Sequence, residues 1–356
     1  MQEKIIEFLK CPVSNESLEL TVFERGNLGK ASDHILEGIL KSSSMSYPII
    51  KGVPRLLKPD LLNNTLKNYP DFIEKHKEHF PDIEKNETKN LKTETQDSFG
   101  LQWNLFPEMF EVWDSNFREY FYPKISVDDF NQKYILDCGC GFGRHLYYSA
   151  KYGAKEVIGV DLSHAVDSAV LNVSEFPNAH VVQGEIYNLP VKANFDLAYT
   201  IGVLQHLPDP LEAFKSIASQ IKVEGEMYAW VYGKRPMSYH LVVDNMRKFT
   251  TTMNRHTLHK LTKFLAYLSF TGLALPRRFL EAIGLNSLGK KVPFSRYAEF
   301  PFQVSHADWF DRLAAPKTVY FSKEETDEFI KASNLQEHDI TFREGGSWKV
   351  WGKRKS

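Results

Sequence analysis

Ile135-Leu136-Asp137-Cys138-Gly139-Cys140-Gly141-Phe142-Gly143 is the stretch that decides the fold of this chain. It begins as an apolar strand and ends in three glycines at alternate positions, which let the backbone bend tightly and approach a ligand closely. A second apolar strand, 157–160, runs into Asp161, 22 residues after Gly139. This spacing is typical of a βαβ unit whose acidic residue binds ribose hydroxyls. The sequence therefore predicts a site for a nucleoside-containing cofactor.

The glycine spacing bears on which cofactor is bound. A dinucleotide fingerprint reads G-x-G-x-x-G, whereas this chain has G-x-G-x-G, and Arg144 stands at the position of the last fingerprint glycine. A large cation there fits the dehydrogenase pattern poorly. The helix expected to begin at Arg144 offers free backbone N–H groups, which hold a pyrophosphate or a free carboxylate equally well.

Five segments, in order, resemble the signature motifs of class I S-adenosylmethionine-dependent methyltransferases. They are 135–143, Val-Asp-Leu-Ser at 160–163, Gln-Gly-Glu-Ile-Tyr-Asn-Leu-Pro at 183–190, the stretch 195–209 and Val-Glu-Gly-Glu at 223–226. The resemblance covers about 98 to 233 and resumes at the C-terminal strands. It implies an α/β, Rossmann-like fold with a mostly parallel seven-stranded sheet, helices on both faces, and S-adenosyl-L-methionine as cofactor.

The resemblance also implies which residues contact that cofactor. Asp137 would lie near the methionine amine, Asp161 would bind the ribose hydroxyls, and Leu162 would cover the adenine face. The Glu185 side chain, where aspartate is commoner, would contact the adenine edge together with the N–H of Ile186. The full set of expected cofactor-binding residues is Asp137, Gly139, Cys140, Gly141, Gly143, Asp161, Leu162, Glu185, Ile186, Ile201 and Gly202.

Gln205 and His206 are the expected catalytic residues. Methyl transfer from a sulfonium is an in-line displacement, in which the protein mainly supplies alignment. A base is needed only when the acceptor must lose a proton early. His206 follows the fourth expected strand of the core and is the candidate base, or else it only shapes the pocket; Gln205 is the candidate for orienting the acceptor.

Composition narrows the class of protein further. The chain has 356 residues, with 44 Lys and Arg against 45 Asp and Glu, and this balance gives no bulk attraction to nucleic acid. Three cysteines and no apolar leader at the N-terminus favour a cytoplasmic protein without a disulfide scaffold. The apolar run 264–275 is about half of the ~20 residues that a membrane span needs, so we expect a buried or lid helix.

Residues 1–58 are expected to form a small module of their own. Cys11-Pro12-Val13-Ser14 and the segment 47–57 resemble the zinc-ribbon-like activator domain of tRNA and protein methyltransferases. That domain uses two Cys-x-x-Cys pairs, but here Ser14 replaces one cysteine and the later pair is missing from 42–46. One thiolate cannot build a four-ligand zinc site, so we expect no metal. A scaffold or docking role and a purely stabilising role both remain open.

The rest of the chain divides into three further parts. Residues 59–97, rich in charged residues, are expected to be a linker with marginal helices, and 98–233 with 318–356 the methyltransferase core. Ser322 and Glu325 predict a capping box at the start of the last helix, 323–333. Two closing strands are expected near 337–342 and 347–352.

The insertion 234–317 is expected to be a helical substrate lid, because this fold places it over the mouth of the active site. The residues assigned to closing over the substrate, some of them outside the insertion, are Gln102, Trp103, Tyr232, Tyr239, His240, Arg296 and Trp309. Its basic residues suit an anionic substrate or a membrane surface, or they form a solvated helix face.

The sequence thus predicts an S-adenosylmethionine-dependent methyltransferase that acts on an oxygen or nitrogen of a small molecule. Two alternatives stay open. The activator-like module suggests an RNA or protein methyltransferase, and a non-catalytic cofactor-binding interaction protein would bind the cofactor without turnover.

Overall fold

The computed structural model describes residues 1–80, 91–234, 237–289, 295–343 and 346–355. The chain forms two compact units, one of Met1–Lys234 with Lys317–Ser356 and the other of Arg235–Pro316. We describe each unit by itself.

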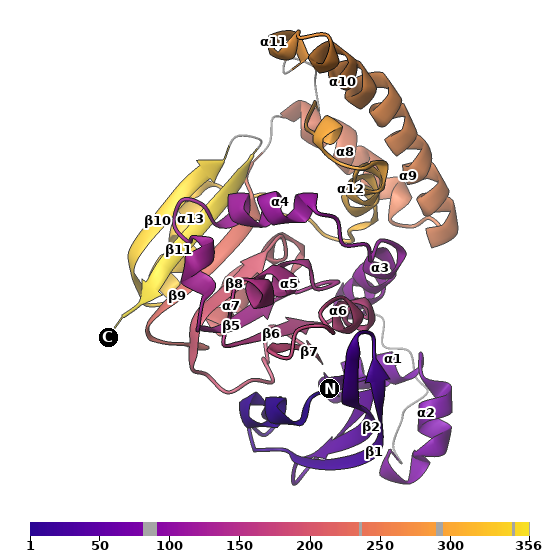
Figure 1. Ribbon diagram of the computed structural model, residues 1–356, viewed down its shortest axis with the longest axis vertical. Coiled ribbons are helices and arrows are strands. Elements are labelled where there is room, and N and C mark those ends of the chain that lie inside the picture. The colour runs from indigo at the N-terminus through magenta and orange to yellow at the C-terminus, as the bar shows by residue number, and fades with distance from the viewer. Residues whose placement is uncertain (81–90, 235–236, 290–294, 344–345, 356) are drawn as a thin grey trace. The chain divides into compact units, whose positions relative to one another are not determined.

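The first unit is built on a mixed sheet (Figure 1). Four strands run parallel at its centre, in the order β7 (Ala179–Gly184), β6 (Glu156–Asp161), β5 (Tyr134–Cys138) and β8 (Phe195–Ile201). The strand β9 (Ile221–Tyr232) continues this direction, and β11 (Ser347–Arg354) with β10 (Leu335–Arg343) closes the edge antiparallel. The carboxyl ends of β5 to β8 therefore meet at one edge of the sheet.

The helices cover both faces of this sheet, as alternate side chains of β8 show. Tyr199 contacts Phe121 of α4 (Val112–Phe121) and Ser149, which lies in α5 (Arg144–Lys151). Its neighbour Ala198 belongs to a core with Phe214 and Phe329, which stack between α7 (Pro210–Ala218) and α13 (Lys323–Ala332). Successive strand residues point to opposite faces, so these are two separate helical layers. The predicted capping box of α13 is present.

The expected seven-stranded sheet is wrong in its extent, because the sheet of the described residues has eleven strands in the order β1-β2-β3-β4-β7-β6-β5-β8-β9-β11-β10. The four additional strands come from the N-terminal segment: β1 (Glu19–Leu28), β2 (Ala31–Lys41), β3 (Ser46–Ile50) and β4 (Val53–Leu56). The last of these pairs in parallel with β7, and Arg55 stands opposite Gln183. The N-terminal segment is thus continuous with the core sheet.

Arg55 ties these two parts together. Its side chain is fully buried and donates to Gln183 at 3.0 Å, to the carbonyl of Ile50 at 3.1 Å and to Asp167 at 2.5 Å. The hydroxyl of Tyr69 also donates to Asp167, at 2.6 Å. Burial would raise the pKa of Asp167, but the charge and hydrogen bonds of Arg55 and the Tyr69 hydroxyl outweigh it, so the pKa falls.

The described residues of the segment 59–97, which are 59–80 and 91–97, are largely helical. It contains α1 (Pro59–Leu66), α2 (Pro70–Lys75) and the start of α3 (Leu91–Leu105). Leu61, Leu62 and Leu66 of α1 are buried in the main core. Prolines at the first positions of α1 and α2 suit a helix start, where the missing N–H costs nothing.

The second unit is helical. Its helices are α8 (Met237–Thr250), α9 (Arg255–Ser269), a π-helical turn at Phe270–Ala274, α10 (Leu275–Ala282), α11 (Asn286–Gly289) and α12 (Phe302–Ala314). Leu258, Thr262 and Ala266 of α9 are buried. Across the described ranges of the chain, no helix is both long and apolar enough to cross a membrane.

Candidate cofactor and acceptor site

The glycine bend follows β5 in a conformation that requires glycine. Gly139, Gly141 and Gly143 have φ values of 82°, 54° and 86°, in the left-handed region. A Cβ on Gly139 would lie 2.3 Å from a methyl carbon of Val203, so the bend packs directly against the loop after β8. The bend leads directly into α5, which begins at Arg144. The first N–H groups of this helix are therefore near the carboxyl end of β5.

Asp137 is the buried acid of this bend. It is 1% exposed, and its Oδ2 has no hydrogen-bond partner among the described residues. Burial raises the pKa of Asp137 to about 8. An orphaned carboxyl oxygen beside a glycine bend fits the ammonium group of a bound methionine moiety, because that cation would stabilise the carboxylate.

Asp161 ends β6 and joins the bend to the next loop. One carboxylate oxygen accepts from the Gly141 N–H at 2.9 Å, and the other accepts from the Ser163 N–H at 2.8 Å and hydroxyl at 2.6 Å. These bonds fix the carboxylate in place while its remaining lone pairs could accept from ribose hydroxyls. Burial raises its pKa, and the bonds from Ser163 and Gly141 oppose that rise.

Glu185, just after β7, has a partner that the sequence did not reveal. Lys92 of α3 forms an ion pair with it, and the Lys92 ammonium lies 4.9 Å from the ring centre of Tyr187. Asn188 donates to the same carboxylate at 3.2 Å. Ile186 is buried, and its carbonyl accepts from Ser216 at 2.6 Å.

The helix α3 runs along this whole edge of the sheet. Its Gln96 donates to the carbonyl of Leu162 at 3.2 Å, and a Cβ on Gly100 would lie 3.0 Å from the backbone nitrogen of His164. Its Trp103 ring centre lies 5.0 Å from that of Phe142 in the glycine bend. We conclude that α3 covers the residues expected to bind the cofactor.

Gln205 and His206 lie in the short helical turn Leu204–His206 after β8. Gln205 is fully buried, and neither polar atom of its side chain has a hydrogen-bond partner among the described residues. His206 is 4% exposed, and its Nδ1 lies 2.8 Å from the carbonyl oxygen of Lys317. Because a carbonyl only accepts, Nδ1 carries the proton in this contact, and the neutral ring then has its lone pair on Nε2.

Gly202 and the aromatic residues around it complete the site. Gly202, after Ile201 at the end of β8, has a φ of 74°, and Gln205 and Trp230 are the nearest side chains to a Cβ built there, both at 3.7 Å. Tyr232 packs edge-on against Trp230 and His206. Tyr120 of α4 also packs edge-on against Trp230. These rings would surround an acceptor beside the cofactor.

The remaining expected residues divide into three groups. Cys140 is buried, with its sulfur 2.9 Å from a Cβ built on Gly159, and Gln102 of α3 is also buried. Trp309 donates to Ser269 at 3.0 Å within the second unit. The side chains of Tyr239, His240 and Arg296 lie outside the described residues.

The N-terminal segment shows what surrounds Cys11. Its sulfur lies 3.1 Å from the Tyr47 hydroxyl and accepts from the Ser14 N–H at 3.4 Å. Glu16 accepts from the hydroxyls of Ser14 and Ser43, both at 2.9 Å. In the described parts of the chain, no three His, Cys, Asp or Glu side chains are grouped to hold a metal ion. The zinc-ribbon resemblance of this segment stays a prediction.

Comparison with known proteins gives a family match for the part of the chain that contains the site. Residues 136–229 match the family model described as "Methyltransferase domain". This range contains the glycine bend, Asp161, Glu185 and the Gln205–His206 turn. Residues 136–229 are therefore similar to methyltransferase domains, as the sequence predicted.

Similar curated proteins have a more specific name. Proteins named "tRNA U34 carboxymethyltransferase" are 30% identical over 104 residues (Pseudoalteromonas atlantica) and 33% identical over 99 residues (Aeromonas hydrophila). These matches cover 28% and 27% of this chain and 32% and 30% of those proteins. The chain thus matches about a third of the length of these relatives.

Solved structures also resemble the chain. Magnesium protoporphyrin IX methyltransferase from Synechocystis PCC 6803 with bound SAM has a TM-score of 0.42 at 12% identity, covering 76% of this chain and 100% of that one. The structure "PigF with SAH" has a TM-score of 0.42 at 14% identity, covering 72% of this chain and 62% of that one. Scores this low carry no inference about function.

Proposed function

We propose that the protein transfers a methyl group from S-adenosylmethionine to an oxygen or nitrogen of a small molecule, giving S-adenosylhomocysteine. The observation that carries this proposal is the Gln205 side chain, which is fully buried and has no partner for either polar atom among the described residues. Such a group costs free energy unless a ligand satisfies it. It lies beside Gly202, 3.7 Å from a Cβ built there.

In this proposal each residue has a limited task. Bound S-adenosylmethionine supplies the electrophilic methyl group. Asp137 holds the ammonium of the cofactor and Asp161 its ribose hydroxyls. Gln205 orients the acceptor, and His206, whose Nδ1 is held by the Lys317 carbonyl, accepts a proton at Nε2 when the acceptor is a hydroxyl or an ammonium. The burial of Gln205 and His206 favours a small acceptor enclosed by the protein. The three free cysteines favour a location in the reducing cytosol.

An RNA acceptor is the second candidate, and the named relatives favour it. Their names specify a tRNA nucleotide. A nucleotide base would have to leave its stack to reach Gln205 and His206, at a cost of a few kcal/mol. The chain carries no net positive charge to attract RNA in bulk, so a basic patch would have to supply the binding energy.

The decisive experiment incubates the purified protein with methyl-labelled S-adenosylmethionine and fractionated cell extract, with and without ribonuclease. We expect label in a small-molecule fraction that ribonuclease leaves unchanged. Label that ribonuclease removes would establish the RNA candidate instead. Cofactor binding by calorimetry without label in any fraction would leave a non-catalytic binding protein.

His206→Ala separates a catalytic from a shaping role within the same assay. A lost base slows transfer by about 10²-fold or more, with cofactor affinity unchanged. An unchanged rate would mean that His206 is not the base and only shapes the pocket.

A further inference from the structure

The helix pair α9–α10 of the second unit has an apolar surface that its own fold does not use. The two helices and the π-helical turn between them form one rod from residue 255 to 282, about 42 Å long at 1.5 Å per residue. One side packs inside the unit through Leu258, Thr262 and Ala266. The run 264–275 was expected to be a buried or a lid helix, and the exposure of Phe264, Tyr267, Leu268 and Leu275 does not fit a helix that is buried throughout.

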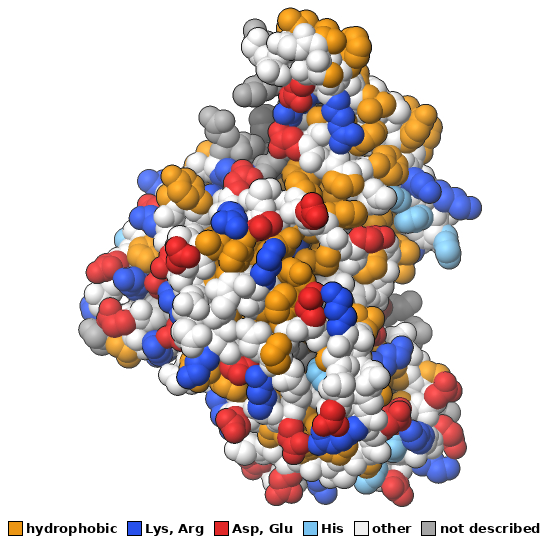
Figure 2. Space-filling view, viewed as in Figure 1, with side chains coloured by type: hydrophobic (Ala, Val, Ile, Leu, Met, Phe, Trp, Pro, Cys, Tyr) orange, Lys and Arg blue, Asp and Glu red, His pale blue; other side chains and the backbone are white. Residues whose placement is uncertain are grey.

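Large apolar side chains cover the outer side of this rod. Phe264, Tyr267 and Leu268 of α9 are 58%, 60% and 49% exposed. Leu275, Phe279 and Ile283 at and beyond α10 are 44%, 65% and 54% exposed. Figure 2 shows apolar side chains gathered along this part of the molecule. Single exposed apolar residues are ordinary, but six exposed large apolar side chains between residues 264 and 283 are typical of an interaction surface.

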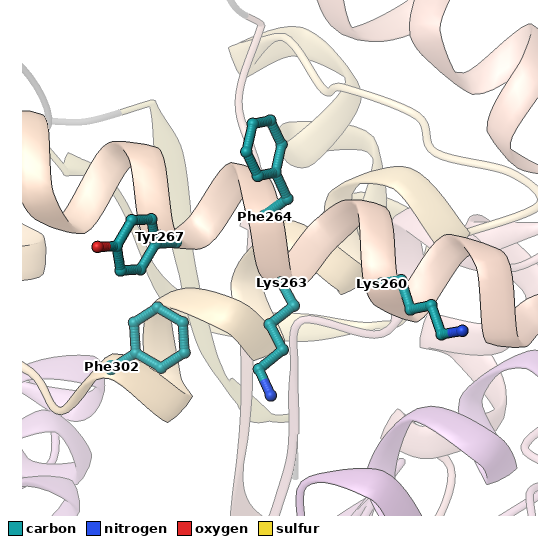
Figure 3. Close-up of a pocket in the computed structure, with 5 residues that line it drawn as sticks. All are labelled: Lys260, Lys263, Phe264, Tyr267 and Phe302. Carbon is teal, nitrogen blue, oxygen red and sulfur yellow. The ribbon is translucent and has the colours of Figure 1, made fainter.

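The charge of this segment selects the kind of partner. Residues 255–289 contain five Lys or Arg and one acid, Glu281, which Arg277 engages at 2.7 Å. Lys260 and Lys263 have no ion-pair partner in the described part of the chain. With Phe264, Tyr267 and Phe302 they line a shallow groove of about 420 Å³ (Figure 3). Figure 3 shows Lys263 extending on the side of the helix where Phe302 lies, Lys260 further along the helix, and Phe264 on the opposite side.

We propose that the α9–α10 face binds the surface of a membrane rich in anionic phospholipids. The apolar side chains would enter the boundary between headgroups and acyl chains, and Lys260 with Lys263 would contact lipid phosphates. A helix of this kind lies on a bilayer, since none of the described helices is apolar enough to span one. RNA would use the lysines but would leave Phe279 and Ile283 in water, so the exposed apolar residues favour lipid.

The test is flotation of the full chain with two kinds of vesicle, one of phosphatidylcholine alone and one of phosphatidylcholine with about 30% of the anionic lipid phosphatidylglycerol. We expect binding to the anionic vesicles only. Lys260→Glu with Lys263→Glu should weaken it at least about 30-fold, from about 1 kcal/mol for each lost cation. Phe264→Ser with Phe279→Ser should weaken it about tenfold or more, because less apolar surface is buried.

Two controls match these variants. Leu171→Ser removes a leucine that is 52% exposed in the first unit, against 49% for Leu268, and Lys331→Glu reverses an exposed lysine of α13. Leu171→Ser and Lys331→Glu should leave binding within twofold of the original chain, whereas Leu268→Ser should weaken it several-fold. Circular dichroism confirms that each variant folds.

Three results would overturn the proposal. The original chain could fail to float with anionic vesicles. The lysine variants could lose binding while the phenylalanine variant keeps it, which would mean simple attraction to any polyanion, RNA included. Gel filtration could show a dimer that Leu268→Ser separates, in which case a second copy of the chain covers the face.

Discussion

At the scale of single residues, Asp137 is an acid whose loss of a proton on cofactor binding can be measured. It is an acid that burial keeps protonated in the free protein, since its pKa lies at about 8. A bound ammonium favours the ionised form and lowers that pKa, so cofactor binding below about pH 8 should expel a proton. The affinity should then rise as the pH increases from 6 to 8.

Asp137→Asn tests this coupling. Calorimetry in two buffers of different ionisation enthalpy at pH 7 should show close to one proton released by the original chain and none by the variant. The variant should bind the cofactor more weakly by about 1–3 kcal/mol, the cost of a lost hydrogen bond to a charged group. Equal proton release from both proteins would mean that Asp137 does not bind the ammonium group of the cofactor.

The residues of the site differ in how far the sequence could predict them. The positive-φ glycines and Asp161 could be predicted because the bend and the strand end are local features, with both partners inside one βαβ unit. The Lys92–Glu185 pair could not, because 93 residues separate its members and neither position has a local pattern. Gln205 was predicted as a candidate, but its burial without a partner required the structure.

At the scale of elements, α3 shows that a charged segment can make contacts inside the protein. Its polar residues suggested a linker with marginal helices up to residue 97, and in the structure Gln96 makes a buried contact to Thr65 and a partly buried one to the Leu162 carbonyl. A polar residue that bonds inside the protein looks the same in sequence as one that faces water. The capping box of α13 was predicted because a capping box needs only the four residues from Ser322 to Glu325.

Gly100 gives a test of the role of α3. Alanine favours a helix over glycine by about 0.5–1 kcal/mol, but a Cβ here would lie 3.0 Å from the His164 backbone. We expect Gly100→Ala to lower the free energy of unfolding by about 1 kcal/mol and to weaken cofactor binding several-fold. Urea denaturation and calorimetry measure both effects.

Gly272 in the second unit is the matched control, because a Cβ there meets no atom within 4 Å. Gly272→Ala should leave cofactor affinity unchanged and keep or slightly raise stability. If Gly100→Ala behaves like Gly272→Ala, α3 does not close tightly over the β6 loop.

At the scale of the whole molecule, Arg55 binds the N-terminal strands to the rest of the first unit. Arg55→Met removes the cation but leaves Asp167 and Gln183 in place, and breaking a buried pair in this way costs about 3–5 kcal/mol. Arg25→Met is the control, because Arg25 pairs with Glu3 while both side chains are exposed, and such pairs contribute about 0–1 kcal/mol.

Urea denaturation of both variants measures this difference. The contribution of Asp167 to the free energy of unfolding depends on pH, because the pKa of Asp167 is lowered in the folded protein. The stabilisation should be complete above the ordinary aspartate pKa, about 4, and should be lost as the pH falls below it. A loss no larger for Arg55→Met than for Arg25→Met would mean that the two parts are held together by the strands alone.

The pairing of β4 with β7 has one more consequence. A strand at the border of a sheet offers unpaired N–H and C=O groups to any passing chain, and proteins usually cover such borders. Here Arg55 and Leu56 stand opposite Gln183 and Gly184. A fragment that begins just before the glycine motif would lack β4 and would leave the edge of β7 unpaired. We expect such a fragment to aggregate through this edge strand.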